Sequence, residues 1–183
     1  MRMSLGRASG VVESDWTFEL AGWAGLLLFR IGSLPQGWML QSVLLNGRDI
    51  TDEPLAVKGT EEITDLEIRV TNRTTEIGGT VTDADGKPVQ EYTVVAFAEE
   101  AARWTYPSRF IRTARPDQAS AFRISNLPPA EYLVVALDYL EEGESDDPEF
   151  LESIRSKAAK LELGDGDKRT LTLKLARLEG QPD

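Results

Sequence analysis

The fold class is decided by two stretches, Tyr92-Thr-Val-Val-Ala-Phe-Ala98 and Tyr132-Leu-Val-Val-Ala-Leu137. Each is rich in the β-branched and aromatic residues that favour strands, and each has the length of a single strand. Neither stretch alternates between apolar and polar side chains. They therefore predict two strands that are apolar on both faces.

Shorter strand signals surround these two stretches. Thr170–Leu175 alternates strictly, with leucines on one face and polar residues on the other. Ile63–Val70 carries a similar stripe, and Ala121–Ile124 is a short alternating strand. The turn signals between them are Asn46-Gly47, Asp85-Gly86, Pro88, Asn126, Pro128-Pro129 and Gly164-Asp165-Gly166. Many short strands joined by turns predict an all-β sandwich or barrel.

One helix is expected, starting at Asp147. This residue can cap the helix, and Pro148 can be its first residue, where a missing N–H costs nothing. The apolar stripe comprises Phe150, Leu151, Ile154 and Ala158, and reaches Leu161 if the helix extends that far. Acidic residues near its start and basic residues near its end agree with the helix dipole. We expect this helix to cover one opening of the sandwich.

Composition narrows the function. The chain has 183 residues, of which 31 are acidic and 20 basic, for a net charge of −11. An acidic surface repels phosphates and anionic lipids, so we expect no nucleic acid and no membrane surface as a partner. The chain has no histidine and no cysteine, which removes the commonest general base and the usual zinc ligands and thiol nucleophiles. We therefore expect no enzyme, no catalytic residue, no metal and no cofactor.

The sequence predicts no secretory signal and no membrane insertion. The apolar run Leu20–Ile31 is too short to span a bilayer. The acidic residues Glu13, Asp15 and Glu19 precede it, which is the wrong charge for a signal peptide. The chain is thus expected to be either cytoplasmic or a piece of a longer protein.

Several motifs recur with offsets of about 90 to 105 residues, the size of one small sandwich. Phe18-Glu-Leu20, Leu34–Trp38 and Asp52–Pro54 recur in the same order as Phe122-Arg-Ile124, Leu127–Tyr132 and Asp147–Pro148. The segment before Phe18 is too short to match the segment before Phe122. We therefore predict two units, a partial or truncated β-sandwich unit in residues 1–77 and a complete β-sandwich domain in residues 78–183.

The second unit resembles carboxypeptidase regulatory-like domains. The resemblance rests on Gly79-Thr-Val-Thr-Asp-Ala-Asp-Gly-Lys-Pro-Val89, on Phe122-Arg-Ile124 and on Leu127-Pro-Pro-Ala-Glu-Tyr132. It implies a prealbumin-like or transthyretin-like β-sandwich that is an accessory, not the zinc-binding catalytic part. It also implies a bacterial protein with such modules in tandem, in a secreted or cell-envelope location. The chain departs from the pattern at Ala119-Ser120-Ala121 and at Ala130, where the family has glycines, and we expect distorted turns there if those positions need a positive φ.

One basic, aromatic segment stands out in this acidic chain. Within Ala101–Arg115, a recognition surface could form from Arg103, Trp104, Tyr106, Arg109 and Arg112, since Trp, Tyr and Arg dominate binding hot spots. Aromatic rings there could also stack on sugars. The alternative is that Trp104 and Phe110 pack in the core while the arginines pair with carboxylates. The second alternative is the more common outcome for large aromatic residues.

Other acidic and aromatic clusters have simpler interpretations. Asp83 and Asp85 with the nearby Glu91, and also Asp165 and Asp167, suggest a calcium site. A calcium loop needs six or more oxygen ligands, and Asp83–Lys87 supplies two, so a plain turn is predicted. Trp16, Trp23 and Trp38 are expected to form the core of the first unit. If half of that unit is absent, some of their surface stays uncovered, which predicts self-association through the first unit.

These observations favour a non-catalytic β-sandwich module that acts as a structural spacer or protein-interaction domain of a larger secreted or envelope protein. The partner would be an unknown protein or a glycan. A carbohydrate-binding module using Trp104 and Tyr106 is the alternative. A carboxylate-based hydrolase ranks third, and it would need two carboxylates about 5–10 Å apart in a cleft.

Overall fold

The computed structural model describes residues 12–21, 24–60 and 62–177. The chain forms two compact units, unit 1 (Met1–Thr71) and unit 2 (Asn72–Asp183). This division lies earlier than the predicted boundary at Gly78, because strand β6 (Glu76–Thr82) already starts at Glu76. The Thr75 hydroxyl also donates a hydrogen bond of 2.6 Å to the carbonyl of Leu127, which ties that residue to unit 2. The predicted all-β class with one short α-helix is confirmed for the described residues.

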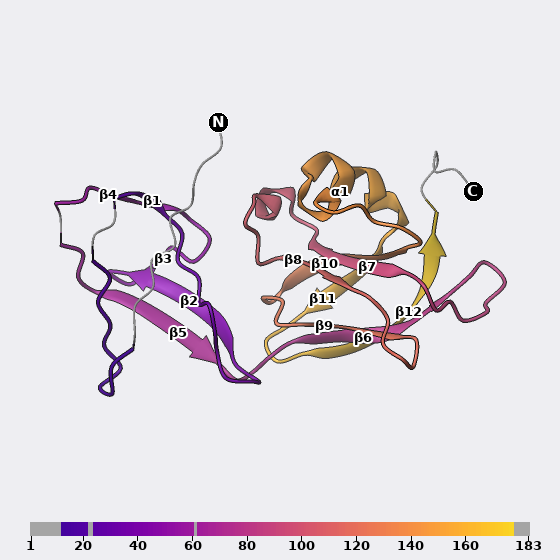
Figure 1. The fold of residues 1–183 in the computed structure, drawn as a ribbon, viewed down its shortest axis with the longest axis horizontal. Coiled ribbons are helices and arrows are strands. Elements are labelled where there is room, and N and C mark those ends of the chain that lie inside the picture. The colour runs from indigo at the N-terminus through magenta and orange to yellow at the C-terminus, as the bar shows by residue number, and fades with distance from the viewer. Residues whose placement is uncertain (1–11, 22–23, 61, 178–183) are drawn as a thin grey trace. The chain divides into compact units, whose positions relative to one another are not determined.

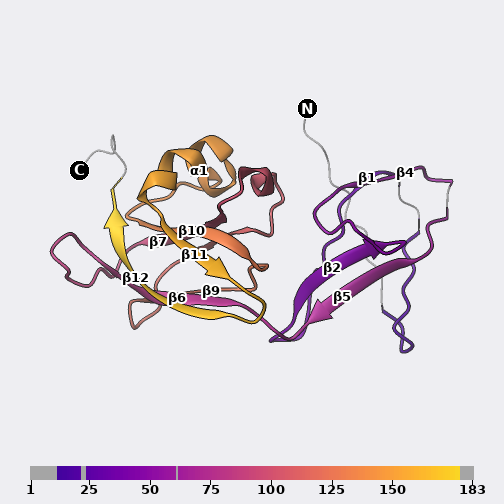
Figure 2. The ribbon, with the colours of Figure 1, turned by 180° about the vertical axis from the view of Figure 1, so that it is seen from behind.

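Unit 2 is a β-sandwich whose two layers meet at strand β12 (Lys168–Ala176) (Figure 1). The first layer contains β9 (Ala121–Ser125), β6 and β12, with β12 parallel to β6 from Lys168 to Lys174. The second layer contains β8 (Ile111–Ala114), β7 (Thr93–Ala98), β10 (Ala130–Leu137) and β11 (Ala159–Leu163), all paired antiparallel. The last two residues of β12 pair with β10, so this strand belongs to both layers, as the reverse view shows (Figure 2).

The interior of the sandwich is filled by alternate side chains of both layers. From β7 and β10 come Val94, Ala96, Ala98, Tyr132, Val134 and Ala136, and from β6, β9 and β12 come Ile77, Val81, Phe122, Ile124 and Leu173. The hydroxyl of fully buried Tyr132 donates to the Pro128 carbonyl at 2.7 Å, which satisfies the one polar atom that this ring brings inside. Leu127 and Tyr132, the first and last residues of the Leu127–Tyr132 motif, thus both belong to the interior.

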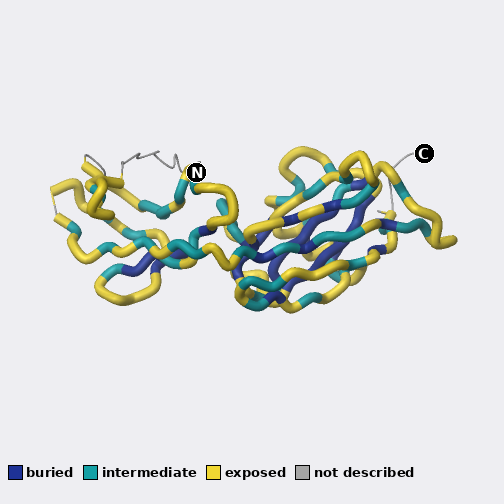
Figure 3. Tube along the Cα trace, turned by 90° about the horizontal axis from the view of Figure 1, so that it is seen from below, coloured by how far each residue is buried: buried dark blue, intermediate teal, exposed yellow. Residues whose placement is uncertain are grey.

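The outer face of the second layer is buried as well. Val95, Phe97, Leu133, Val135 and Leu137 point to the opposite side from their neighbours and pack under Leu151 and Ile154 of helix α1 (Pro148–Ile154). Burial on two sides explains why Tyr92–Ala98 and Tyr132–Leu137 are both apolar on both faces. The most deeply buried part of unit 2 accordingly follows its central strands (Figure 3).

Helix α1 begins as predicted and ends sooner. Asp147 is the N-cap and accepts a hydrogen bond of 2.9 Å from the Glu149 amide, and Pro148 is the first helical residue. The helix stops at Ile154, a 3₁₀ turn η3 (Arg155–Lys157) follows, and Leu161 lies in strand β11. The helix covers the outer face of β7 and β10 and not an opening of the sandwich, which corrects that expectation. No described helix is long and apolar enough to cross a bilayer.

The two departures from the family pattern differ in the structure. Ser120 adopts a left-handed φ of 59°, in the turn that joins β8 to β9. Ala130 has no positive φ and starts β10, paired with Leu163. Only the turn at Ser120 therefore holds a conformation that glycine would adopt more easily.

The described part of unit 1 contains two small sheets. Strand β1 (Gly25–Leu27) pairs with β4 (Leu55–Val57), and β2 (Met39–Leu45) pairs with β3 (Arg48–Asp49) and with β5 (Leu66–Thr71). The buried side chains are few among the described residues: Met39, Val43, Leu44, Ile50 and Thr51. Trp16 is 84% exposed and Trp38 39%, so the expectation that they form the core is wrong, and Trp23 lies outside the described residues.

Strand β2 follows the Leu34–Trp38 motif, and β10 begins within the corresponding Leu127–Tyr132 motif. Later in each unit, β5 carries the apolar stripe that ends at Val70, and β12 the stripe that ends at Leu175. Their pairing differs between the units. Strand β5 is antiparallel to β2, whereas β12 is parallel to β10. The motif order is thus repeated in the sequence, but the strand arrangement of unit 2 is not repeated in the described part of unit 1.

Candidate functional site

The predicted recognition segment forms the connection from β7 to β8. After Ala98 the chain makes a 3₁₀ turn, η1 (Ala101–Trp104), and an irregular loop that ends at Phe110. The Ser108 hydroxyl holds this loop, since it donates to the Arg103 carbonyl at 2.5 Å and accepts from the Phe110 amide at 3.1 Å. We call Glu99–Phe110 the β7–β8 loop.

Trp104 lies in the core beneath the β7–β8 loop. It is 2% exposed, and its indole N–H donates to the Ala98 carbonyl at 2.7 Å. Its ring meets Phe97 edge to face, with centroids 5.5 Å apart. Trp104 has no free ring face for a ligand, so the core alternative holds for it and its assignment to a recognition surface is corrected.

The guanidinium of Arg155 lies over the Trp104 indole. It lies 5.2 Å from the Trp104 ring and donates twice to the Glu99 carbonyl, each at 3.2 Å. It also pairs with Glu152 at 2.9 Å. The end of α1 and the start of the β7–β8 loop are therefore held together through one side chain. Sequence reasoning placed Arg155 only by its charge at the helix end, because a contact with a residue fifty positions away leaves no local signal.

Arg103 and Arg109 both lie against Phe110. Their guanidinium carbons are 4.7 and 5.3 Å from the ring centroid, within the range of cation–π attraction. Arg103 also pairs with Glu100 at 2.7 Å, which agrees with the expectation that arginines of this segment meet carboxylates. Phe110 itself is 6% exposed and belongs to the interior. The loop thus presents two cationic groups beside a buried aromatic ring.

Tyr106 and Arg112 are the exposed members of the predicted set. The Tyr106 ring is 68% exposed in the β7–β8 loop. Arg112 is exposed on β8 and donates to the carbonyl of Ile111 at 2.8 Å. The structure therefore brings Arg103, Tyr106 and Arg109 to the surface of one loop, places Arg112 on the adjoining strand, and removes Trp104 from the set.

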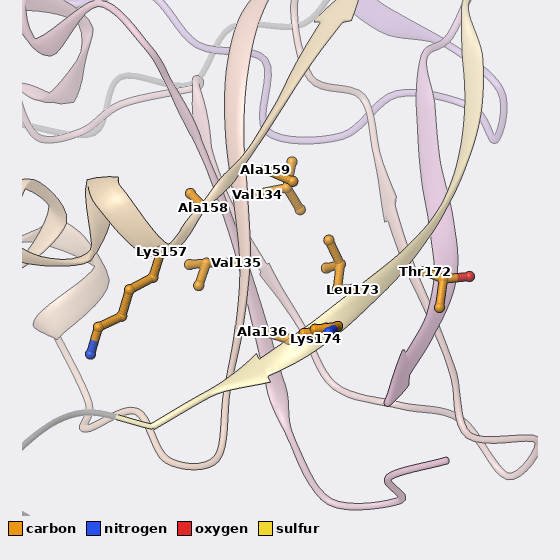
Figure 4. Close-up of a pocket in the computed structure, with 9 residues that line it drawn as sticks. All are labelled: Val134, Val135, Ala136, Lys157, Ala158, Ala159, Thr172, Leu173 and Lys174. Atoms are coloured by element: carbon orange, nitrogen blue, oxygen red, sulfur yellow. The ribbon is translucent and has the colours of Figure 1, made fainter. Parts of the chain in front are cut away.

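A cleft of about 250 Å³ lies elsewhere on unit 2, where β11 and β12 diverge along β10 (Figure 4). β10 pairs with β11 up to Val134 and with β12 from Ala136, and the cleft opens beside Val135. Apolar and polar groups line it in similar measure, and Lys157 and Lys174 are its charged residues. Lys157 donates to the Arg177 carbonyl at 2.7 Å. None of the described residues that line the cleft is a carboxylate, so the cleft does not supply the pair that a glycoside hydrolase uses.

The acidic candidates serve as turn residues. The Asp83 carboxylate accepts from the amides of Asp85 at 2.9 Å and Lys87 at 2.8 Å, which confirms the predicted plain turn. Asp165 pairs with Arg73 at 3.1 Å, and Asp167 accepts from the Gly164 amide at 3.0 Å. Within the described ranges, no three acidic side chains are grouped as a metal site would require.

Comparisons with known proteins add little. No family model and no curated protein matches the chain. A DUF3823 family protein from Parabacteroides merdae is 12% identical over 55% of this chain and 45% of its own length, with a TM-score of 0.34. The chain therefore spans less than half the length of that protein.

Two other solved structures are similarly distant. A candidate carbohydrate-binding protein from Pseudomonas aeruginosa is 13% identical over 55% of this chain and 87% of its own, with a TM-score of 0.33. BcpA, the major pilin subunit of Bacillus cereus, is 11% identical over 92% and 77%, with a TM-score of 0.38. At these values no conclusion about fold or function passes from those proteins to this chain.

Proposed function

We propose that unit 2 is a non-catalytic β-sandwich module that acts as a structural spacer within a larger protein. The observation that carries the proposal is the parallel pairing of β6, where the chain enters the sandwich, with β12, where it leaves. Seven residue pairs join them, from Glu76–Lys168 to Thr82–Lys174. A secreted or envelope location is part of the proposal and rests on the family resemblance alone.

Parallel pairing of these strands suits a module that bears tension. The chain enters at the Glu76 end of the pair and leaves beyond Ala176, at the opposite end. Tension along the chain therefore pulls the two strands past each other and loads all their hydrogen bonds together. A pull from the same end would break those bonds one at a time, at a lower force.

The interior of unit 2 also supports a structural role. The described side chains fill both faces of the β7–β10 layer, and every buried polar side-chain atom among them has a hydrogen-bond partner. The chain lacks histidine and cysteine. The cleft beside Val135 has no carboxylate among its described lining residues. A spacer needs a packed module and no reactive group.

The test is the unfolding force of unit 2 in two pulling directions. Because the chain has no cysteine, handles can be attached at introduced cysteines, at Asn72 and Arg177 in one variant and at Asn72 and Asp165 in the other. All three residues are exposed. The spacer proposal predicts a clearly higher force for the first pair, at equal stability in urea. Equal forces in both directions would contradict it.

A second candidate is a recognition module, and exposed Tyr106 between Arg103 and Arg109 favours it. Such a surface would bind a protein or a glycan through the tyrosine ring and the two cations. Oligosaccharide titration followed by NMR separates the two functions. Glycan binding predicts amide shifts around the β7–β8 loop that Tyr106→Ala abolishes and that Tyr139→Ala, the same change at another exposed tyrosine, leaves intact. Absence of shifts at millimolar saccharide removes the glycan function.

A further inference from the structure

Strand β5 has one edge with no paired strand in the part of the chain that the structure describes. It lies at the end of the sheet with order β3-β2-β5, and within the described residues β2 is its one partner strand. An open edge presents unpaired backbone groups to any strand that can align with it. The sheet has three strands and few buried side chains, so a further strand would add hydrogen bonds to a sheet that is marginal in size.

The side chains of β5 divide into two faces. Leu66, Ile68 and Val70 are half-buried on one face, and Glu67 and Arg69 are exposed on the other. Arg69 Nε donates to Glu67 Oε1 at 2.7 Å, while the two side chains remain 53% and 57% exposed. This hydrogen bond lowers the pKa of Glu67 and raises that of Arg69, so both are charged at neutral pH. The edge therefore carries one negative and one positive charge, two residues apart.

When two β5 strands pair with each other, their charges are complementary in one of three registers. Two copies of β5 can pair antiparallel about a two-fold axis at Glu67, at Ile68 or at Arg69 and keep their apolar faces on the same side. An axis at Glu67 sets carboxylate against carboxylate, and an axis at Arg69 sets guanidinium against guanidinium. An axis at Ile68 sets each Glu67 opposite Arg69 of the other copy, and each Leu66 opposite Val70. Opposite charges across a strand pair attract, and like charges directly opposite destabilise it.

Charges on an edge strand also serve to prevent pairing. A protective pattern uses charges of one sign, since these repel in every register. The two signs on β5 repel in two of the registers and attract in the third. The pattern therefore selects a register and does not exclude pairing.

We propose that a second copy of this chain pairs antiparallel with β5, centred on Ile68, to form a symmetric dimer with a continuous six-stranded sheet from two copies of β3-β2-β5. The interface is isologous, as a two-fold axis requires. Two exposed ion pairs and one short strand pair give weak association that weakens further as salt screens the charges.

The test is sedimentation equilibrium of the full chain up to about 1 mM, a concentration that reveals weak dimers. Glu67→Arg leaves two cations on the edge, and Arg69→Glu leaves two anions, so each variant repels its own copy. Each change is expected to weaken self-association at least about tenfold. An equimolar mixture of the two variants restores opposite charges at every position and is expected to form a heterodimer. The double variant Glu67→Arg/Arg69→Glu is expected to form a homodimer again.

A matched control is Glu53→Arg, which makes the same charge change in the exposed Arg48–Glu53 ion pair of unit 1 and leaves β5 intact. It is expected to dimerise like the original chain. Circular dichroism and thermal unfolding verify that every variant is folded. The proposal is overturned if the original chain stays monomeric, if either single variant dimerises normally, or if the mixture fails to associate.

Discussion

Ser120 holds a left-handed backbone conformation, with φ at 59°, in a turn where the Asp117 carboxylate accepts from the amides of Ala119 at 2.8 Å and Ala121 at 3.0 Å. Its amide donates to the Asp117 carbonyl at 3.0 Å, and its own carbonyl accepts from the Tyr92 hydroxyl at 2.8 Å. None of these bonds needs the serine side chain. For an L-residue this conformation costs roughly 1–2 kcal/mol.

Ser120→Gly is therefore predicted to stabilise unit 2. Relief of the strain exceeds the greater entropy of glycine in the unfolded chain, which is about 0.4–1 kcal/mol. We expect the free energy of unfolding in urea to rise by about 0.5 kcal/mol. Ala119→Gly, one residue earlier and without a positive φ, is the control and is expected to lower it. The same sign for both variants would contradict the argument.

The phenolic proton of Tyr92 makes the free energy of unfolding depend on pH in the alkaline range. Burial, and then the nearby Asp117 charge, raise its pKa above the ordinary value of 10.0. The unfolded chain thus loses the phenolic proton at a lower pH than the folded chain does. The contribution of Tyr92 to the free energy of unfolding is fully present below the pKa of the unfolded chain. It is lost as pH rises through the pKa of the folded chain.

We predict that the free energy of unfolding falls more steeply above pH 10 in the original chain than in Tyr92→Phe. At neutral pH the variant is expected to be less stable by about 1 kcal/mol, because the Ser120 carbonyl loses its donor. Urea denaturation at a series of pH values measures both effects. Parallel pH profiles for the two proteins would refute the role of Tyr92.

Residue-level prediction from the sequence succeeded where the signal is local. The cap at Asp147 and the turn at Asp83 depend on side chains that bond amides two to four residues away, and sequence spacing records such contacts. Trp104 could not be placed this way. Its burial depends on Phe97 and Arg155, and Arg155 comes from a distant element, so the sequence left both a core role and a surface role open.

At the scale of elements, β6 and β12 approach each other closely at Gly79. A methyl group added there would lie 1.8 Å from the carbonyl oxygen of Leu171, the residue that Gly79 faces across the strand pair. Both atoms of this clash are fixed to backbone. A methyl group at the preceding Gly78 meets its nearest atom, the Phe122 carbonyl oxygen, at 3.5 Å, an ordinary contact.

Gly79→Ala is therefore predicted to destabilise unit 2 by more than about 3 kcal/mol, because the strand pair must separate to admit the methyl group. Gly78→Ala is expected to change the free energy of unfolding by less than about 0.5 kcal/mol. Thermal unfolding of the two variants compares adjacent glycines in one strand. Similar melting temperatures for both would show that β6 and β12 are not in the register described.

Element boundaries depend on tertiary packing and were predicted less well than element types. The stripe from Phe150 to Leu161 fits a helix, yet Leu161 lies in β11 and pairs with Tyr132. A helix continued to that point would leave the edge of β10 without a partner. Pairing of β11 with β10 outweighs the helical periodicity, and no local signal reports that competition.

At the scale of the whole molecule, the all-β class followed from strand signals and turns, while the layering did not. The apolar faces of Thr93–Ala98 and Tyr132–Leu137 implied burial on two sides. The sequence did not reveal that one face lines the sandwich interior and that the other packs against α1. The parallel partner of β6 lies some ninety residues away in the sequence. Local sequence patterns therefore could not predict the order of the strands.

Both the sandwich and its proposed role as a spacer depend on the parallel pairing of β6 with β12. NMR tests it through nuclear Overhauser contacts between the backbone protons of the two strands. Parallel pairing predicts contacts that link Ile77 with Arg169, Gly79 with Leu171 and Val81 with Leu173, in ascending order along both strands. Contacts in descending order, or contacts from β6 to β9 alone, would contradict it.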